Sequence, residues 1–182
     1  MADFDIAYKI TAKWEGGYVN DPDDSGGETY AGISRKNWPK WEGWPHVDRL
    51  KGRVASSWNL NASRTIDMRP LNDAVLSFYK TNFWDKIKGD QINNQSIANM
   101  LYDWYVNSGY HAIKSIQEVV GAYPDGVIGP KTIHLINSGG QEEIFNSLRV
   151  ARLKFYDNIV KNRPTQRKFL DGWRNRTNDI VF

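Results

Sequence analysis

One glutamate, Glu15, has neighbours that favour acid catalysis. It follows Trp14 at the end of a segment with helical spacing and precedes Gly16–Gly17, which we expect to end that helix. Carbonyl groups at a helix C-terminus disfavour a negative charge, and the rings of Trp14 and Tyr18 can exclude water from the carboxyl group. Both effects favour the protonated form, which a general acid must hold near neutral pH.

More acids follow without any Lys or Arg up to residue 28. The five acids of this stretch are Glu15, Asp21, Asp23, Asp24 and Glu28. A carboxyl group beside a further carboxylate and a hydroxyl, such as Asp24 and Thr29, can hydrolyse a glycosidic bond. Two alternatives stay open: the acids form a solvated loop in which Glu15 only caps or pairs, or the Asp cluster binds calcium. The common calcium loop carries a glutamate at its twelfth position, which is missing here.

The composition excludes several enzyme classes. The chain has 182 residues and no cysteine, so disulfides, thiolate metal sites and a cysteine nucleophile are excluded. Its three histidines lack the spacing of a zinc enzyme, and no Gly-rich phosphate loop is present. We therefore expect no metal and no other cofactor. No apolar run reaches the length of a membrane span, so we expect no stable membrane insertion, and the acidic N-terminus shows no secretory signal.

Charge and aromatic content point to possible partners. The formal net charge is +3, and residues 149–176 carry nine Lys and Arg against two Asp. Such a stretch fits an anionic partner such as nucleic acid, anionic lipid or a cell-wall polymer, or it is simply a solvated helix face. The eight Trp and nine Tyr are either core residues or the floor of a sugar-binding cleft.

Periodicity predicts a mainly α chain with a small β-hairpin or loop element near the N-terminus. Turn-forming residues occupy 18–33, and 38–70 is expected to be irregular with a short helix or two. We expect helices over 4–14, from Asn72 towards Trp84, from Ser96 to Gly109, over 112–120, from Pro130 to 136, and over 142–160.

Four segments in this order resemble glycoside hydrolase family 108, the phage-type N-acetylmuramidases of the lysozyme-like group. They are residues 15–33, 83–86, 103–109 and 125–132. The resemblance implies an α+β lysozyme-like fold, with a catalytic region at 1–90 and a helical, predicted peptidoglycan-binding region at 91–182, packed as one unit. It also implies hydrolysis of the β-1,4 bond between N-acetylmuramic acid and N-acetylglucosamine, as in an endolysin.

The resemblance also implies roles for particular residues. Glu15 falls on the general acid, and Asp24 and Thr29 fall where lysozymes of this shape surround the nucleophilic water. Asp24 either activates that water or stabilises the developing oxocarbenium charge, and Thr29 orients the water. A carboxyl separation of roughly 6.5–9.5 Å would leave room for a water, and one of roughly 5–5.5 Å would favour direct attack. Tyr18, Asn20 and Tyr30 of the same motif are expected to contact substrate.

Two later segments have alternative interpretations. Asp103 and Asn107 share a helix face, and with Trp104 they either line the cleft and hold N-acetyl groups or fix helix packing by buried hydrogen bonds. The loop at 125–132 either binds the cell wall or makes a tight turn into a helix.

Three other functions compete with hydrolysis. A lytic transglycosylase would use one acid and give a 1,6-anhydro product, and a non-catalytic module would only bind the wall. A nucleic-acid-binding domain has only the basic stretch in its favour, so we expect no nucleic acid. We expect a monomer acting on peptidoglycan glycan strands. Without a signal it would stay cytoplasmic until a holin pore or a secretion machine delivers it to the wall.

Overall fold

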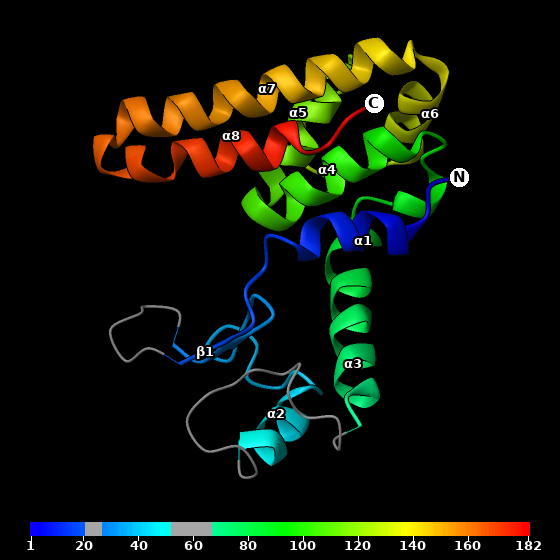
Figure 1. Cartoon of the computed structure of the whole chain (residues 1–182). Helices are drawn as coiled ribbons and strands as arrows, with labels where there is room; N and C mark the ends of the chain where they lie inside the picture. Colours follow the sequence, from blue (N-terminus) through cyan, green and yellow to red (C-terminus); the bar gives the residue numbers. More distant parts are fainter. Residues whose placement is uncertain (21–26, 52–66) are drawn as a thin grey trace. The chain divides into compact units, whose positions relative to one another are not determined.

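A computed structural model describes residues 1–20, 27–51 and 67–182 (Figure 1). Contacts divide the chain into two units. We call residues 12–80 the sheet unit, and residues 1–11 together with 81–182 the helical unit. The helices are α1 (Phe4–Ala12), α2 (Trp44–Lys51), α3 (Arg69–Tyr79), α4 (Gln95–Ser108), α5 (Tyr110–Val119), α6 (Pro130–Ser138), α7 (Gln141–Asn162) and α8 (Leu170–Asn178).

The sheet unit contains a small antiparallel sheet in the order β1 (Tyr18–Val19), β2 (Thr29–Tyr30) and β3 (Ile33–Ser34). Tyr30 pairs with Tyr18 on one side and with Ile33 on the other. Only Ala31 and Gly32 connect β2 to β3, and both have a positive φ, of 47° and 77°. Two successive positive φ angles make the tight hairpin turn that suits the twist of paired strands. The mainly α fold with a small sheet near the N-terminus is confirmed.

Two tryptophans of the sheet unit, Trp41 and Trp44, pack in its core. Trp41 and Trp44 are buried with their rings 5.1 Å apart, and the ring of Trp38 lies 4.9 Å from that of Phe78. The indole N–H of Trp41 donates to the carbonyl of Ala74 on α3, at 3.2 Å. These contacts connect α3 to the segment before α2, and α2 is one of the short helices expected within 38–70.

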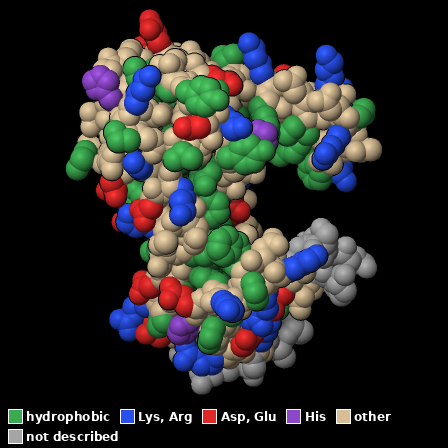
Figure 2. All heavy atoms as spheres, turned by 180° about the vertical axis from the view of Figure 1, so that it is seen from behind, with side chains coloured by type: hydrophobic (Ala, Val, Ile, Leu, Met, Phe, Trp, Pro, Cys, Tyr) green, Lys and Arg blue, Asp and Glu red, His purple; other side chains and the backbone are tan. Residues whose placement is uncertain are grey.

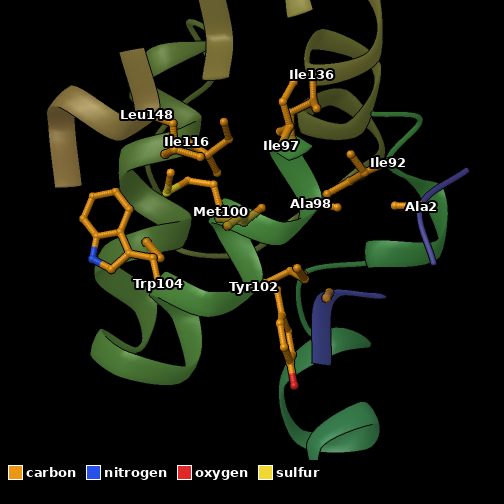
Figure 3. Close-up of a cluster of buried hydrophobic side chains, with 14 of the residues drawn as sticks. Ala2, Ile92, Ile97, Ala98, Met100, Tyr102, Trp104, Ile116, Ile136 and Leu148 are labelled. Atoms are coloured by element: carbon orange, nitrogen blue, oxygen red, sulfur yellow. The ribbon is translucent and has the colours of Figure 1, made fainter. Parts of the chain in front are cut away.

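The core of the helical unit is built around α4. Every residue from Ile97 to Trp104 is buried, so this central part of the helix is enclosed on all sides. Figure 3 shows several of its side chains within the buried cluster. Helices α5 and α7 pack against it, and α8 returns along α7. Shorter turns complete the chain: a π-helical segment at Lys80–Trp84 and 3-10 turns at Gly89–Gln91 and Pro164–Phe169.

Most predicted helices are present, with shifted starts. Helix α3 begins at Arg69 rather than after Asn72, because Pro70 suits the first turn, where no N–H is needed. Helix α4 is capped by Asn94 instead of Ser96, since the Asn94 side chain accepts from the N–H of Ile97 at 3.0 Å. The start at Pro130 and the long helix over 142–160 are confirmed.

Candidate active site

Glu15 lies just beyond α1, not within it. The helix ends at Ala12, and the N–H of Glu15 donates to the carbonyl of Ala12 at 3.3 Å. The preceding Trp14 is 40% exposed, so part of its ring is open to water. The Glu15 carboxyl group lies beside the β2–β3 turn.

Two side-chain groups lie close to Gly32 of that turn: the carboxyl group of Glu15 and the hydroxyl group of Tyr79. A Cβ atom added to Gly32 would lie 2.5 Å from Oε2 of Glu15 and 2.7 Å from the hydroxyl of Tyr79. The same hydroxyl donates to the carbonyl of Ala31 at 2.7 Å. Glu15, the turn and the end of α3 therefore meet at one point. Tyr79 was missed by the sequence analysis because nothing local connects it to Glu15, which lies far away in the chain.

The other residues predicted around Glu15 have different placements. Thr29 is half-buried, and its hydroxyl donates to the carbonyl of Gly27 at 3.2 Å. Asn20 is exposed at the end of β1. Tyr30 is only 5% exposed and stacks on Trp41 at 6.3 Å, and this burial raises the pKa of its hydroxyl. It has little surface left for a substrate. Asp24, like the proposed calcium cluster, lies outside the described residues.

Tyr18 is positioned by Glu28, a second residue without a predicted role. The Tyr18 hydroxyl donates to Oε1 of Glu28 at 3.0 Å, and Nζ of Lys51 lies 5.4 Å from the Tyr18 ring. The Glu28 side chain is 14% exposed and forms ion pairs with Lys51 and with Arg35, whose Nε is 3.0 Å from Oε2. Two cations thus compensate the charge of Glu28.

Asp103 belongs to a buried ion-pair cluster. Its carboxylate accepts from Nη2 of Arg152 at 2.6 Å, from Nε and Nη2 of Arg176 at 2.9–3.1 Å, and from the hydroxyl of Thr11 at 2.9 Å. The Asp103 and Arg152 side chains are fully buried. Burial on its own raises the pKa of Asp103, but the attraction of Arg152 and the bonds from Arg176 outweigh it and lower the pKa below its ordinary value.

Trp104 and Asn107 also contribute to helix packing. Trp104 is fully buried, and Asn107, although exposed, accepts from the Tyr156 hydroxyl of α7 at 2.6 Å. Burial leaves Asp103 and Trp104 no atom for a glycan to contact in this structure. Of the two interpretations that the sequence left open, the placement favours helix packing, and we retain that one.

Comparison with known families assigns the chain. The model described as "Glycosyl hydrolase 108" matches residues 8–109, and the "Predicted Peptidoglycan domain" matches residues 111–178. The chain belongs to glycosyl hydrolase family 108. Its two matched regions support a peptidoglycan hydrolase. They meet near Gly109, whereas the contacts divide the chain after Thr11 and after Lys80. A functional boundary near residue 90 stays a prediction.

A solved structure extends the comparison of this family 108 chain. It is similar to SagA of Brucella abortus, with 29% identity over 97% of this chain and 90% of that one, and a TM-score of 0.66. No curated protein matches the chain. The structural similarity supports the lysozyme-like α+β fold.

The loop after α5 is fastened to that helix. The Gln117 side-chain amide donates to the carboxylate of Asp125 at 2.8 Å and to the carbonyl of Val127 at 3.0 Å, and it accepts from the N–H of Gly126 at 2.9 Å. The bonds from Gln117 and from the N–H of Val127 lower the pKa of Asp125. Gly126 has a φ of 82°, which favours glycine. These contacts stabilise the loop as a tight turn that leads into α6.

The basic stretch at 149–176 is not one charged face. Arg152 and Arg176 point into the core towards Asp103, and Arg174 pairs with Asp157 at 2.8 Å. Figure 2 shows Lys and Arg side chains dispersed over the visible surface rather than gathered in one patch. Within the described ranges, no helix is long and apolar enough to cross a membrane, and no group of three or more His, Asp or Glu is placed to hold a metal ion.

Proposed function

We propose that the chain is an N-acetylmuramidase that hydrolyses the β-1,4 bond between N-acetylmuramic acid and N-acetylglucosamine, with Glu15 as general acid. The observation that carries the proposal is the contact of the Glu15 carboxyl group with Gly32 of the β2–β3 turn. A catalytic acid must be kept in one position relative to the bond it protonates. Here the turn and the end of α3 supply that support.

Gly32 and Tyr79 have distinct supporting roles in this proposal. Gly32 lacks a side chain, so the Glu15 carboxyl group can lie directly against the backbone of the turn. The Tyr79 hydroxyl binds the carbonyl of Ala31, which fixes the turn relative to α3. Tyr79 is therefore a positioning residue.

The proposed reaction follows the chemistry of glycosidases. Glu15 gives its proton to the glycosidic oxygen as the bond to the sugar C1 breaks, and a water oxygen then bonds to C1. In this proposal Asp24 takes the proton of that water or stabilises the oxocarbenium charge, and Thr29 orients the water. Tyr18, held by Glu28, and the exposed Asn20 contact the glycan.

The first test replaces Glu15 by Gln, which keeps the size of the side chain and removes the acid. The release of fragments from purified sacculi should fall at least about a hundredfold, as expected for loss of a general acid. Glu42→Gln is the matched control, because Glu42 is an exposed acid in the same unit, and its rate should stay unchanged. A Glu15→Gln protein that digests sacculi nearly as fast as the parent protein would contradict the assignment.

Mass spectrometry of the released fragments identifies the reaction. Reducing-end N-acetylmuramic acid is the expected product. Fragments with 1,6-anhydro ends would instead identify the reaction as that of a lytic transglycosylase. A protein that stays bound to sacculi without releasing fragments would be identified as a wall-binding module.

A further inference from the structure

A hollow of about 410 Å³ lies against the C-terminal half of α7, within the region that matches the peptidoglycan domain. Five of its lining residues come from α7 or directly follow it, and His111 comes from the first turn of α5. The lining comprises His111, Phe155, Asn158, Ile159, Asn162 and Arg163. This volume and this mixture of apolar and polar groups are typical of a ligand site.

The apolar wall of the hollow is held in place from behind. The ring of Phe155 lies 5.0 Å from that of His111, 5.5 Å from that of Tyr156 and 5.8 Å from that of the fully buried Trp104. Tyr156 is in turn bound to Asn107 and to Arg152. The buried cluster around Asp103 therefore fixes the rotation of α7 and the position of this wall, and such preorganisation lowers the cost of binding.

The polar groups of the hollow have no partner within the described part of the chain. The side chains of Asn158, Asn162 and Arg163 are exposed, and none forms a hydrogen bond or an ion pair with another described residue. Asn158 and Asn162 are four positions apart and therefore share one face of α7. Two amides and a guanidinium group are thus available to a ligand on one side of the Phe155 wall.

The charge of the lining residues favours an anionic ligand. Arg163 is its cation, and no Asp or Glu is among the residues that line it. A second hollow, of about 440 Å³, lies earlier along the same helix, and its lining includes Lys154 but again no acid. Guanidinium groups bind carboxylates through paired hydrogen bonds. In peptidoglycan the free carboxylates belong to the peptide stems, since the unsubstituted sugar hydroxyl and N-acetyl groups are neutral.

We propose that the hollow formed by His111, Phe155, Asn158, Asn162 and Arg163 binds a carboxylate-bearing peptide stem of peptidoglycan. This inference rests on the proposed function for its ligand, and it places wall recognition on α7 rather than on the loop at 125–132. Arg163 binds the carboxylate, the two asparagines bind peptide groups, and the Phe155 wall contacts the alanine methyl groups of the stem.

The test is titration of the full chain with a synthetic stem pentapeptide that has free carboxylates, followed by NMR of ¹⁵N-labelled protein. The side-chain amide signals of Asn158 and Asn162 should shift and saturate. The same peptide with its carboxylates amidated, and a chitin tetrasaccharide, should leave them unshifted. Shifts at these amides on addition of the tetrasaccharide would identify the hollow as a glycan site. Pentapeptide-induced shifts confined to residues 125–132 would instead indicate that this loop binds the stem. Either result would overturn the proposal.

Arg163→Gln should weaken pentapeptide binding about tenfold, since a charge-assisted bond is lost. Arg167→Gln is the matched control, because Arg167 is exposed nearby but outside the lining, and it should bind as the parent protein does. Equal binding by both variants would refute the role of Arg163. The outcome is separate from that of the proposed hydrolysis: peptide binding without fragment release contradicts only the hydrolase, and fragment release without peptide binding contradicts only this site.

Discussion

At the scale of single residues, two acidic side chains have different surroundings in the two units. Glu15 is half-buried, and its carboxyl group lies beside Gly32 of the β2–β3 turn. Asp103 is enclosed and accepts bonds from two arginines and a threonine. A carboxylate so fully bonded is held in its ionised form, which suits a structural role. Acid catalysis requires a group that can hold and release a proton, so the enclosed Asp103 is not suited to that role.

Replacement of Gly32 by Ala tests the contact at Glu15. The new Cβ would meet Oε2 of Glu15 at 2.5 Å, and the φ of 77° strains any residue with a side chain. We expect a loss of about 1 kcal/mol in the free energy of unfolding, and a fall of about tenfold or more in the rate of fragment release, because small displacements of a catalytic group are costly.

The control for this variant is Gly27→Ala. Gly27 has a similar φ of 62°, but nothing lies within 4 Å of an added Cβ. It should show a comparable loss of stability without the loss of rate. Equal rates for the two variants, measured on sacculi under the same conditions, would mean that the turn does not position Glu15.

At the scale of elements, one carboxylate joins four helices. Asp103 of α4 binds Thr11 of α1, Arg152 of α7 and Arg176 of α8. Arg152 also donates to the Tyr156 hydroxyl at 3.1 Å and contacts the sulfur of Met100 at 3.6 Å. Because three of these side chains are buried and charged, removal of one leaves the others without compensation.

Asp103→Asn should therefore lower the free energy of unfolding by about 3–5 kcal/mol at neutral pH, as measured by urea denaturation. Asp157→Asn is the matched control, because Asp157 pairs with Arg174 at the surface, where both side chains are about half exposed, and it should cost less than about 1 kcal/mol. A cost for Asp103→Asn as small as that of the control would contradict the structural role of the cluster.

The stability difference between the parent protein and Asp103→Asn should depend on pH. The pKa of Asp103 is lower in the folded chain than its ordinary value, so folding favours the ionised form. Its contribution to stability is complete above the unfolded pKa of about 4 and is lost as the pH falls through the folded pKa. The difference in stability between the parent protein and Asp103→Asn should therefore shrink as the pH is lowered from 6 towards 3. A constant difference over this range would contradict the lowered pKa.

At the scale of the whole molecule, the family boundary and the structural units do not coincide. The peptidoglycan-domain match begins at residue 111, but α4, which buries Arg152 and supports Phe155, precedes it. The N-terminal residues also belong to the helical unit, since the N–H of Ala2 donates to the carbonyl of Ile92 at 2.7 Å. The core of the helical unit is therefore built around α4, which lies within the region that matches the glycosyl hydrolase family.

A fragment of residues 111–182 should consequently be largely unfolded, because it leaves Arg152 without Asp103 and exposes the apolar faces that α4 covers. A fragment of residues 81–182 retains α4 and should unfold cooperatively. Circular dichroism at 222 nm during heating distinguishes them. A cooperative transition of equal size in the shorter fragment would show that the matched region folds without α4.

Most of the helices and the local features of the site follow from residues that are close together in the chain. Periodic apolar residues predicted α7, Pro130 predicted the start of α6, and Glu15 with its glycine-rich continuation predicted an acid before a turn. These features depend on residues within a few positions of one another, where helix spacing and turn preferences act directly.

The contacts between distant residues, in contrast, become visible only in the folded chain. Asp103 and Arg176 are separated by 73 positions, and the basic stretch that contains Arg152 and Arg176 could not be distinguished in the sequence from a solvated helix face. Likewise, nothing near Tyr79 marks it as a neighbour of Glu15 and Gly32. The physical reason is that an ion pair or a close contact depends on distance in space, and the packing of several helices or of a turn on a helix fixes that distance, whereas local spacing fixes only the face on which a residue lies.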